Sequence, residues 1–408
     1  MNPLGTYFSK RLESVFYVGL IAAATLFSGS LTAQASVQVD AKLAHSYDTN
    51  VFQTRAGSLA DQSSWISRFE PRIRLQLDAD TQLSYRLEAV RFWDASSEDH
   101  LRHHLGLQTR GELAALTYRF STTHLQVQGP GDALVFDEGR SAFSTSSARE
   151  RRNQWQNRTQ GDLRWDVSER QFLRVRGSLL YYDLNSNVRI QPRYDNWIDR
   201  YDINAAIDWG RQLDNGLQAY FGLQRGYQHQ GRQGGRLSDR SNHYHRLLFG
   251  LSGRVHEDLN VNIEVGPSRH EYRTGPGPLR TTRWFGNLAA TWQVSGKDQL
   301  SAQVSKRRFV ASTGNLANII SSYSLSWNRQ MNSQLSWRLQ GQLRSIEYDG
   351  VDIGDWLYIG RAGVSYKLDS GILLDLEFER TLGRDERQSV AGREYNGNVF
   401  TLSAAYSF

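Results

Sequence analysis

The chain closes with NVFTLSAAYSF, residues Asn398–Phe408, and this stretch decides the fold. Large apolar residues recur at alternate positions and end on Phe408, whereas the positions between them are mostly small and polar. A β-strand sends successive side chains to opposite faces, so the pattern predicts one aromatic-rich face and one polar face. Soluble domains rarely end on a large aromatic residue, because termini fray. We therefore expect a terminal strand whose apolar face contacts lipid.

The same residues resemble the C-terminal insertion signal of Gram-negative outer-membrane β-barrels. The matching positions are Phe400, Leu402, Tyr406 and Phe408. The resemblance implies insertion by the barrel assembly machinery and a location in the outer membrane of a Gram-negative cell. Membrane lipid and lipopolysaccharide would then surround the protein.

Composition agrees with a membrane barrel and excludes other classes. Only 39% of the 408 residues are hydrophobic, which argues against a bundle of membrane helices. Aromatic residues reach 12%, as expected for alternating strands with aromatic girdles. The chain contains no Cys, so disulfides and thiolate metal sites are excluded. The formal net charge of +6 favours anionic partners, and no motif indicates nucleic acid.

Residues 1–35 differ from the rest of the chain. Lys10 and Arg11 precede an apolar run that ends at Phe27, and residues 33–35 have the A-x-A form of a cleavage site. This pattern predicts a secretory signal peptide over residues 1–35 and a single barrel domain over residues 36–408. The apolar run is shorter than a membrane-spanning helix needs.

After residue 35, apolar residues recur on one parity in one segment after another. We expect an all-β fold, a transmembrane antiparallel β-barrel of about 18 strands. Short connections, such as those at Arg110-Gly111 and Glu257-Asp258, alternate with long polar ones. This alternation places both ends of the mature chain in the periplasm. A soluble β-sandwich or propeller fits less well, since it predicts connections of similar length.

Proline is expected outside the strands, because it cannot donate a hydrogen bond to a ladder. Pro71 falls inside a predicted strand, and the sequence offers no reason for it. The prolines expected in loops or at their edges are Pro130, Pro192, Pro267, Pro276 and Pro278.

Charged residues lie on the parity opposite the apolar residues, so they are expected to line the lumen. Arginine and carboxylate on neighbouring strands would form a lattice of salt bridges that stiffens the wall. The excess of arginine would instead attract anions and bind carboxylate or phosphate through paired hydrogen bonds. The predicted anion-binding residues are Arg68, Arg72, Arg74, Arg86, Arg119, Arg158, Arg164, Arg174 and Arg176.

The longest internal connection, 129–151, contains GDALVFDEGR and follows the fifth predicted strand. In position and charge it resembles the constriction loop of porins, which folds into the lumen. The resemblance implies a constriction loop that includes Phe136, Asp137 and Glu138. Its two acids would face an arginine cluster such as Arg72, Arg74 and Arg86. A surface loop with ordinary acidic residues is the alternative.

The start of the mature chain, HSYDTNVFQT (His45–Thr54), provides a second resemblance. It is similar to the Y-D-x-N-[VL]-F motif of β-barrel porins encoded with exopolysaccharide operons, whose inferred role is polysaccharide export. The matching residues are Tyr47, Asp48, Asn50, Val51 and Phe52. Asp48 and Asn50 would also suit a strand-to-loop transition without any transport role.

An enzyme is not expected. The chain has no G-x-S-x-G motif, and its histidine clusters, 100–104 and 243–245, fall near predicted rims. Two histidines on one face could bind a metal, but no carboxylate set is spaced to complete the site. We predict no catalytic residues, no metal and no cofactor.

The predicted function is an outer-membrane channel with an arginine-rich lumen that passes anionic or sugar-type solutes passively, in polysaccharide export or as a porin. One alternative is a substrate-specific uptake porin for an anionic solute. Another is a closed structural or adhesive surface barrel. A gated exporter would also need a periplasmic partner.

Overall fold

The computed structural model describes residues 36–51, 62–128, 154–183, 199–213, 216–230, 241–273, 279–310, 317–348, 354–385 and 395–408. The predicted signal peptide lies outside these residues. So do Phe52 and the connection that carries Phe136, Asp137 and Glu138.

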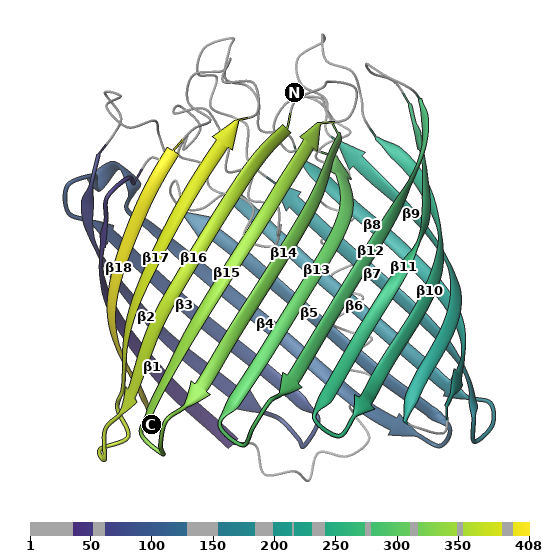
Figure 1. The fold of residues 1–408 in the computed structure, drawn as a ribbon, viewed down its shortest axis with the longest axis horizontal. Coiled ribbons are helices and arrows are strands. Elements are labelled where there is room, and N and C mark those ends of the chain that lie inside the picture. Colours follow the sequence, from purple (N-terminus) through teal and green to yellow (C-terminus); the bar gives the residue numbers. More distant parts are fainter. Residues whose placement is uncertain are drawn as a thin grey trace.

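The described chain forms one 18-stranded antiparallel sheet that closes into a barrel (Figure 1). Consecutive strands pair throughout, and β1 pairs with β18 from Asp40↔Ser407 to Asp48↔Val399. The predicted fold class is therefore confirmed. The strands are β1 (Ser36–Asp48), β2 (Ser64–Gln76), β3 (Thr81–Phe92), β4 (His100–Leu113), β5 (Leu116–Gln128), β6 (Gln154–Asp166), β7 (Gln171–Asp183), β8 (Arg200–Gln212), β9 (Leu217–Gln230), β10 (Asn242–His256), β11 (Leu259–Tyr272), β12 (Arg280–Gln293), β13 (Asp298–Val310), β14 (Ala317–Gln330), β15 (Leu335–Tyr348), β16 (Gly354–Lys367), β17 (Leu373–Asp385) and β18 (Tyr395–Ser407).

The two ends of the barrel differ, and we call them the turn end and the loop end. Ser36 and Phe408 both lie at the turn end, where short connections join the strands (Figure 1). The turn expected at Arg110-Gly111 is wrong, because β4 continues to Leu113 and the turn is Ala114-Ala115. Short turns face the periplasm in bacterial barrels, which places both strand termini on that side.

The outer surface of the wall is apolar. Large apolar side chains on one parity of most strands are exposed, including Trp284 at 66%, and Phe408 after β18 is exposed at 74%. The terminal positions Phe400, Leu402 and Tyr406 are exposed on the same face. No helix in the described ranges is long and apolar enough to cross a membrane. A closed antiparallel barrel with an apolar exterior is the architecture of an outer-membrane protein.

Prolines enter two strands at gaps in a ladder. Pro71 pairs with Ala41 of β1, but the β2–β3 ladder is interrupted at residues 70 and 71. The loop position expected for Pro267 is wrong, because β11 runs to Tyr272. Pro267 pairs with Trp284 of β12, and the β10–β11 ladder skips the corresponding positions. Each proline thus occupies a place where its missing amide hydrogen is not needed on one side.

Inward-facing aromatic rings lie flat on glycines of neighbouring strands. A Cβ added to Gly250 would come within 1.9 Å of the Tyr220 ring, and one on Gly210 within 2.1 Å of Phe172. Tyr244 covers Gly226 in the same way. The glycines leave room for the rings, so rings can lie against the inner wall instead of crossing the lumen.

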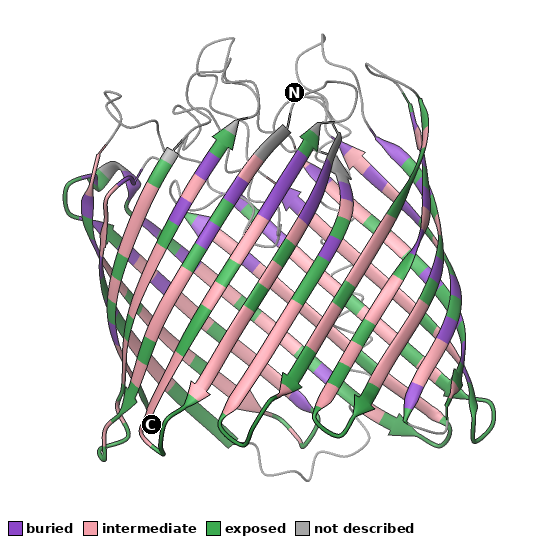
Figure 2. Cartoon of the chain, in the orientation of Figure 1, coloured by how far each residue is buried: buried purple, intermediate pink, exposed green. Residues whose placement is uncertain are grey.

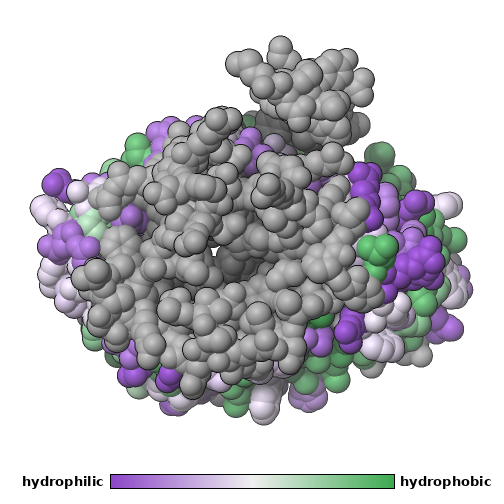
Figure 3. Space-filling view, turned by 90° about the horizontal axis from the view of Figure 1, so that it is seen from above, coloured by the Kyte–Doolittle hydropathy of each residue, from purple (hydrophilic) through white to green (hydrophobic). Residues whose placement is uncertain are grey.

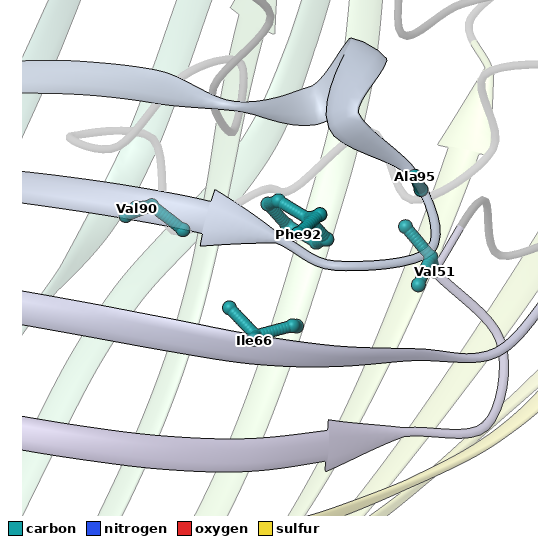
Figure 4. Close-up of a cluster of buried hydrophobic side chains, with 5 residues drawn as sticks. All are labelled: Val51, Ile66, Val90, Phe92 and Ala95. Atoms are coloured by element: carbon teal, nitrogen blue, oxygen red, sulfur yellow. The ribbon is translucent and has the colours of Figure 1, made fainter.

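The segment after β1 is anchored at the loop end, on the inner wall (Figure 4). Asp48 accepts a hydrogen bond from the Asn50 amide (2.8 Å), and the Asn50 side chain donates to the Asn396 carbonyl oxygen (3.0 Å). Val51 is fully buried and packs in a cluster with Ile66, Val90, Phe92 and Ala95. Residues of the Y-D-x-N-V-F motif therefore help to fasten the β1–β18 seam.

Replacing Gly250 with Ala should destabilise the barrel by about 1–3 kcal/mol, because the added methyl displaces the packed Tyr220 ring. Gly341→Ala is the matched control, since a Cβ there meets nothing within 4 Å. Its effect should stay within about 0.5 kcal/mol. Urea unfolding of the refolded variants, followed by tryptophan fluorescence, measures both. Equal effects would show that the ring is not held against Gly250.

Candidate functional site

The candidate site is the lumenal face of the wall. Nine arginines were predicted to bind anions there. All nine lie on the parity opposite the exposed apolar side chains, and they fall into two clusters joined by a middle group. Their role in anion binding stays a prediction.

The first cluster joins β1 to β4 around one buried carboxylate. The Glu88 carboxylate forms ion pairs with Arg68 Nε at 3.2 Å and with Arg102 Nη1 at 3.1 Å. Arg86 contacts the neighbouring His104 ring at 3.0 Å, and Arg74 binds Asp40 at 2.5 Å. His104 therefore faces the lumen, four residues from the loop-end start of β4. The cluster holds four strands of the inner wall together.

The second cluster joins β7, β8 and β11. Asp208 is completely buried and lies 2.8 Å from both Arg174 and Arg176. Arg176 also reaches Glu264 at 2.8 Å, which accepts a hydrogen bond from the Tyr220 hydroxyl at 2.9 Å. The Arg174 guanidinium stacks over the Tyr220 ring, 4.4 Å from its centroid. Two cations thus share the buried carboxylate of Asp208, and Tyr220 is joined to them through Arg174 and Glu264.

The middle group contains one paired arginine and two that make no ion pair with a described residue. Arg164 pairs with Asp166 at 2.7 Å and stacks over Phe172 at 4.0 Å. Arg119 and Arg158, by contrast, have no ion pair with any described residue. Within the described ranges the same holds for the following lumenal cations: Lys42, Arg72, Arg254 and Arg283.

Two cavities open from the lumen beside these cations. The larger has a volume of about 730 Å³, and its charged lining comprises Arg110, Arg119 and Arg176 with Asp80 and Asp162. Carboxamides dominate the rest of its polar lining, with Gln76, Gln82, Gln108, Gln160, Gln224 and Asn204. The smaller has a volume of about 320 Å³, and its charged lining comprises Lys42, Arg72, Arg74 and Arg86, with Asp40 and Glu70. Both cavities carry more cations than acids.

Buried residues of the wall gather toward the loop end (Figure 2). A neutral polar network, which the sequence did not suggest, accounts for part of this burial. His270 contacts Asn242 at 3.0 Å, Asn242 donates to Gln228 at 3.1 Å, and Gln228 and Tyr244 both donate to Asp202. Its members are uncharged apart from Asp202, so a search for charges overlooks them.

Toward its end, β13 separates from β12 but stays paired with β14 as far as Val310↔Ala317. The β12–β13 ladder stops at Gly286↔Lys306, and the carbonyl oxygen of Arg308 accepts a hydrogen bond from Gln228 of β9 at 3.3 Å. The Arg308 guanidinium lies 5.1 Å from the centroid of the Tyr272 ring of β11. The lumen is therefore narrowed on this side of the loop end. Seen from above, the wall has an oval outline (Figure 3).

Histidine and carboxylate side chains do not assemble into a metal site within the described part of the chain. His103 and His243 lie on the outer surface against aromatic rings instead. The His103 ring contacts the Tyr85 hydroxyl at 2.9 Å, and the His243 ring lies 4.7 Å from that of Tyr227.

No protein-family model matches the chain, and no curated protein is detectably similar in sequence. Among solved structures, OccK2 (OpdF) of Pseudomonas aeruginosa is 11% identical with a TM-score of 0.47, covering 92% of this chain and 98% of that chain. A BenF-like porin from Pseudomonas fluorescens Pf-5 is 10% identical with a TM-score of 0.47, covering 92% and 99%. OpdK of Pseudomonas aeruginosa is 11% identical with a TM-score of 0.45, covering 91% and 99%.

Removing the buried carboxylate should weaken the wall. Asp208→Ala leaves Arg174 and Arg176 without their shared partner, so the free energy of unfolding should fall by about 3 kcal/mol. Glu377→Gln removes a more exposed pair with Arg338 (3.1 Å) and should cost less than about 1 kcal/mol. Urea titration at neutral pH compares the two. A smaller loss for Asp208→Ala would mean that the cluster does not stabilise the barrel.

Proposed function

We propose that this barrel is a passive outer-membrane channel for anionic solutes, and that the unpaired lumenal cations provide the selectivity. An 18-stranded barrel is wide enough for an aqueous path. One observation carries the proposal. On the described inner wall most acids are engaged in ion pairs or hydrogen bonds, whereas several cations make no ion pair.

Most described lumenal acids are already engaged. Glu88, Asp208 and Glu379 each pair with at least one arginine, the last with Arg361 at 2.6 Å. Asp202 accepts hydrogen bonds from neutral side chains. The cations named above make no ion pair with a described residue, so their field extends into the water-filled space. A passing carboxylate or phosphate would complete their hydrogen bonds.

The cavity of about 730 Å³ favours a sugar-type anion. Its carboxamides can donate and accept hydrogen bonds at once, as sugar hydroxyls require, while Arg119 supplies the charge. This chemistry supports passage of an acidic polysaccharide or of smaller sugar acids. A specific uptake porin for another anion and a closed structural barrel are the competing functions, and the two experiments below separate them.

The first experiment measures ion selectivity. In planar bilayers, the mature protein should show a steady current whose reversal potential in a salt gradient indicates anion preference. The triple variant R72E/R119E/R158E should lower the anion-to-cation permeability ratio by about threefold or more, because it reverses the unpaired lumenal charges.

The matched control is R225E/R280E/K306E, which makes the same change in net charge on the outer surface. Its permeability ratio should stay close to that of the wild type. A wild-type protein without current would favour the closed barrel. An equal loss of anion preference in both triple variants would show that the lumenal arginines do not determine the selectivity.

The second experiment identifies the solute class. Oligomers of a sugar acid, such as oligogalacturonate, should block the current about tenfold more tightly than neutral malto-oligosaccharides of equal length, which corresponds to one charged hydrogen-bonded pair. Arg119→Gln should reduce that difference. Block by a simple aromatic carboxylate but by neither oligosaccharide would support the specific uptake porin.

A further inference from the structure

An apolar groove crosses the outer surface of β13 to β17. Its volume is about 550 Å³, within the range of roughly 300–1,000 Å³ typical of small-molecule sites. Outward-facing side chains form its walls, and one charged residue, Arg380, contributes to its lining. The apolar and aromatic members are Val304, Tyr323, Leu325, Leu343, Tyr358 and Leu382.

Strand register creates the groove. Gly341 and Gly360 pair directly, and the same row continues to Leu325 on one side and to Arg380 on the other. A Cβ added to either glycine would meet nothing within 4 Å. The neighbouring rows carry large side chains, Leu343 and Tyr358 above and Leu339 below. The two glycines therefore form the floor of a trough in a surface that is otherwise bulky.

The row ends at Arg380, whose charge makes no ion pair with a described residue. Arg380 and Arg384 both face outward on β17 and are exposed, and neither makes an ion pair with a described residue. Leu382 lies between them on the same face. Arginine on the lipid-facing side of a barrel is unfavourable unless it reaches the polar zone or meets an anion.

We propose that the groove binds the lipid A portion of lipopolysaccharide, with an acyl chain over Gly341 and Gly360 and a phosphate at Arg380 and Arg384. The strands lean so that this row rises from Leu325 on β14 to Arg380 on β17, toward the loop end (Figure 1). The loop end faces the outer leaflet, where lipopolysaccharide is the anionic lipid. Its phosphates would then lie at the arginines, and its acyl chain would descend into the apolar belt.

A second outer groove also contains an arginine, but that arginine is not available to an anion. It has a volume of about 460 Å³ and contains Arg91 beside Leu43 and Phe69. Its lining also includes the acidic Asp99, and the Arg91 guanidinium is already stacked over Trp93 at 4.5 Å. That arginine is stacked on a ring and shares its groove with a carboxylate, so the second groove does not offer the same anion site.

Native mass spectrometry tests the proposal. Purified mature protein in detergent is mixed with diphosphorylated lipid A, phosphatidylglycerol or phosphatidylethanolamine, and the lipid retained per barrel is measured. The wild type should keep lipid A in preference to the other two. R380Q/R384Q removes the phosphate partners, and G341L/G360L fills the trough from two positions where an added Cβ meets nothing within 4 Å. Each should lower lipid A retention about fivefold or more.

Two controls make the result specific. R225Q removes an outward arginine elsewhere, and A290L adds apolar bulk on the outer face of β12. Both should retain lipid A as the wild type does. Unchanged retention in G341L/G360L would overturn the groove as the site. Equal retention of phosphatidylethanolamine would overturn phosphate recognition, and equal retention of phosphatidylglycerol would overturn the assignment to lipopolysaccharide.

Discussion

Every backbone amide and carbonyl group that enters hydrocarbon must find its hydrogen-bond partner within the protein. In this chain the requirement is met by closing the sheet, because β1 pairs with β18 from Asp40 to Asp48. Once the sheet is closed, each strand has one face in lipid and one in the lumen. The apolar belt, the charged interior and the position of the chain termini all follow from that division.

Inside the barrel, arginine has two roles: some arginines stabilise the wall, and others face the solute. Arg174 and Arg176 are fixed by the buried Asp208 and stiffen the wall. Arg72 and Arg119 make no ion pair with a described residue, although acids lie nearby in both cavities, and their charge remains available to a solute. The choice between a structural lattice and an anion-binding lining is therefore made residue by residue. Geometry decides it, since the arginines are chemically alike.

The sequence predicted what depends on alternation along one strand. The barrel, its strand number and the lumenal parity of the arginines follow from neighbours two residues apart, as at Phe400 and Leu402. It did not predict what depends on the adjacent strand. The Tyr220 ring can lie against the inner wall because Gly250 lies beside it, and Pro267 is tolerated because a ladder is interrupted there. Such pairings are set by register between distant segments.

Glu379 and Arg380 show how strict that register must be. Glu379 faces the lumen and binds Arg361 at 2.6 Å, whereas Arg380, the next residue, is exposed on the lipid side. A slip of one residue would exchange the two faces. It would place the carboxylate in the membrane and leave Arg361 without its acid. The lumenal pair thus holds β17 in the register that presents Arg380 to the outer leaflet, so the two faces of the wall constrain each other.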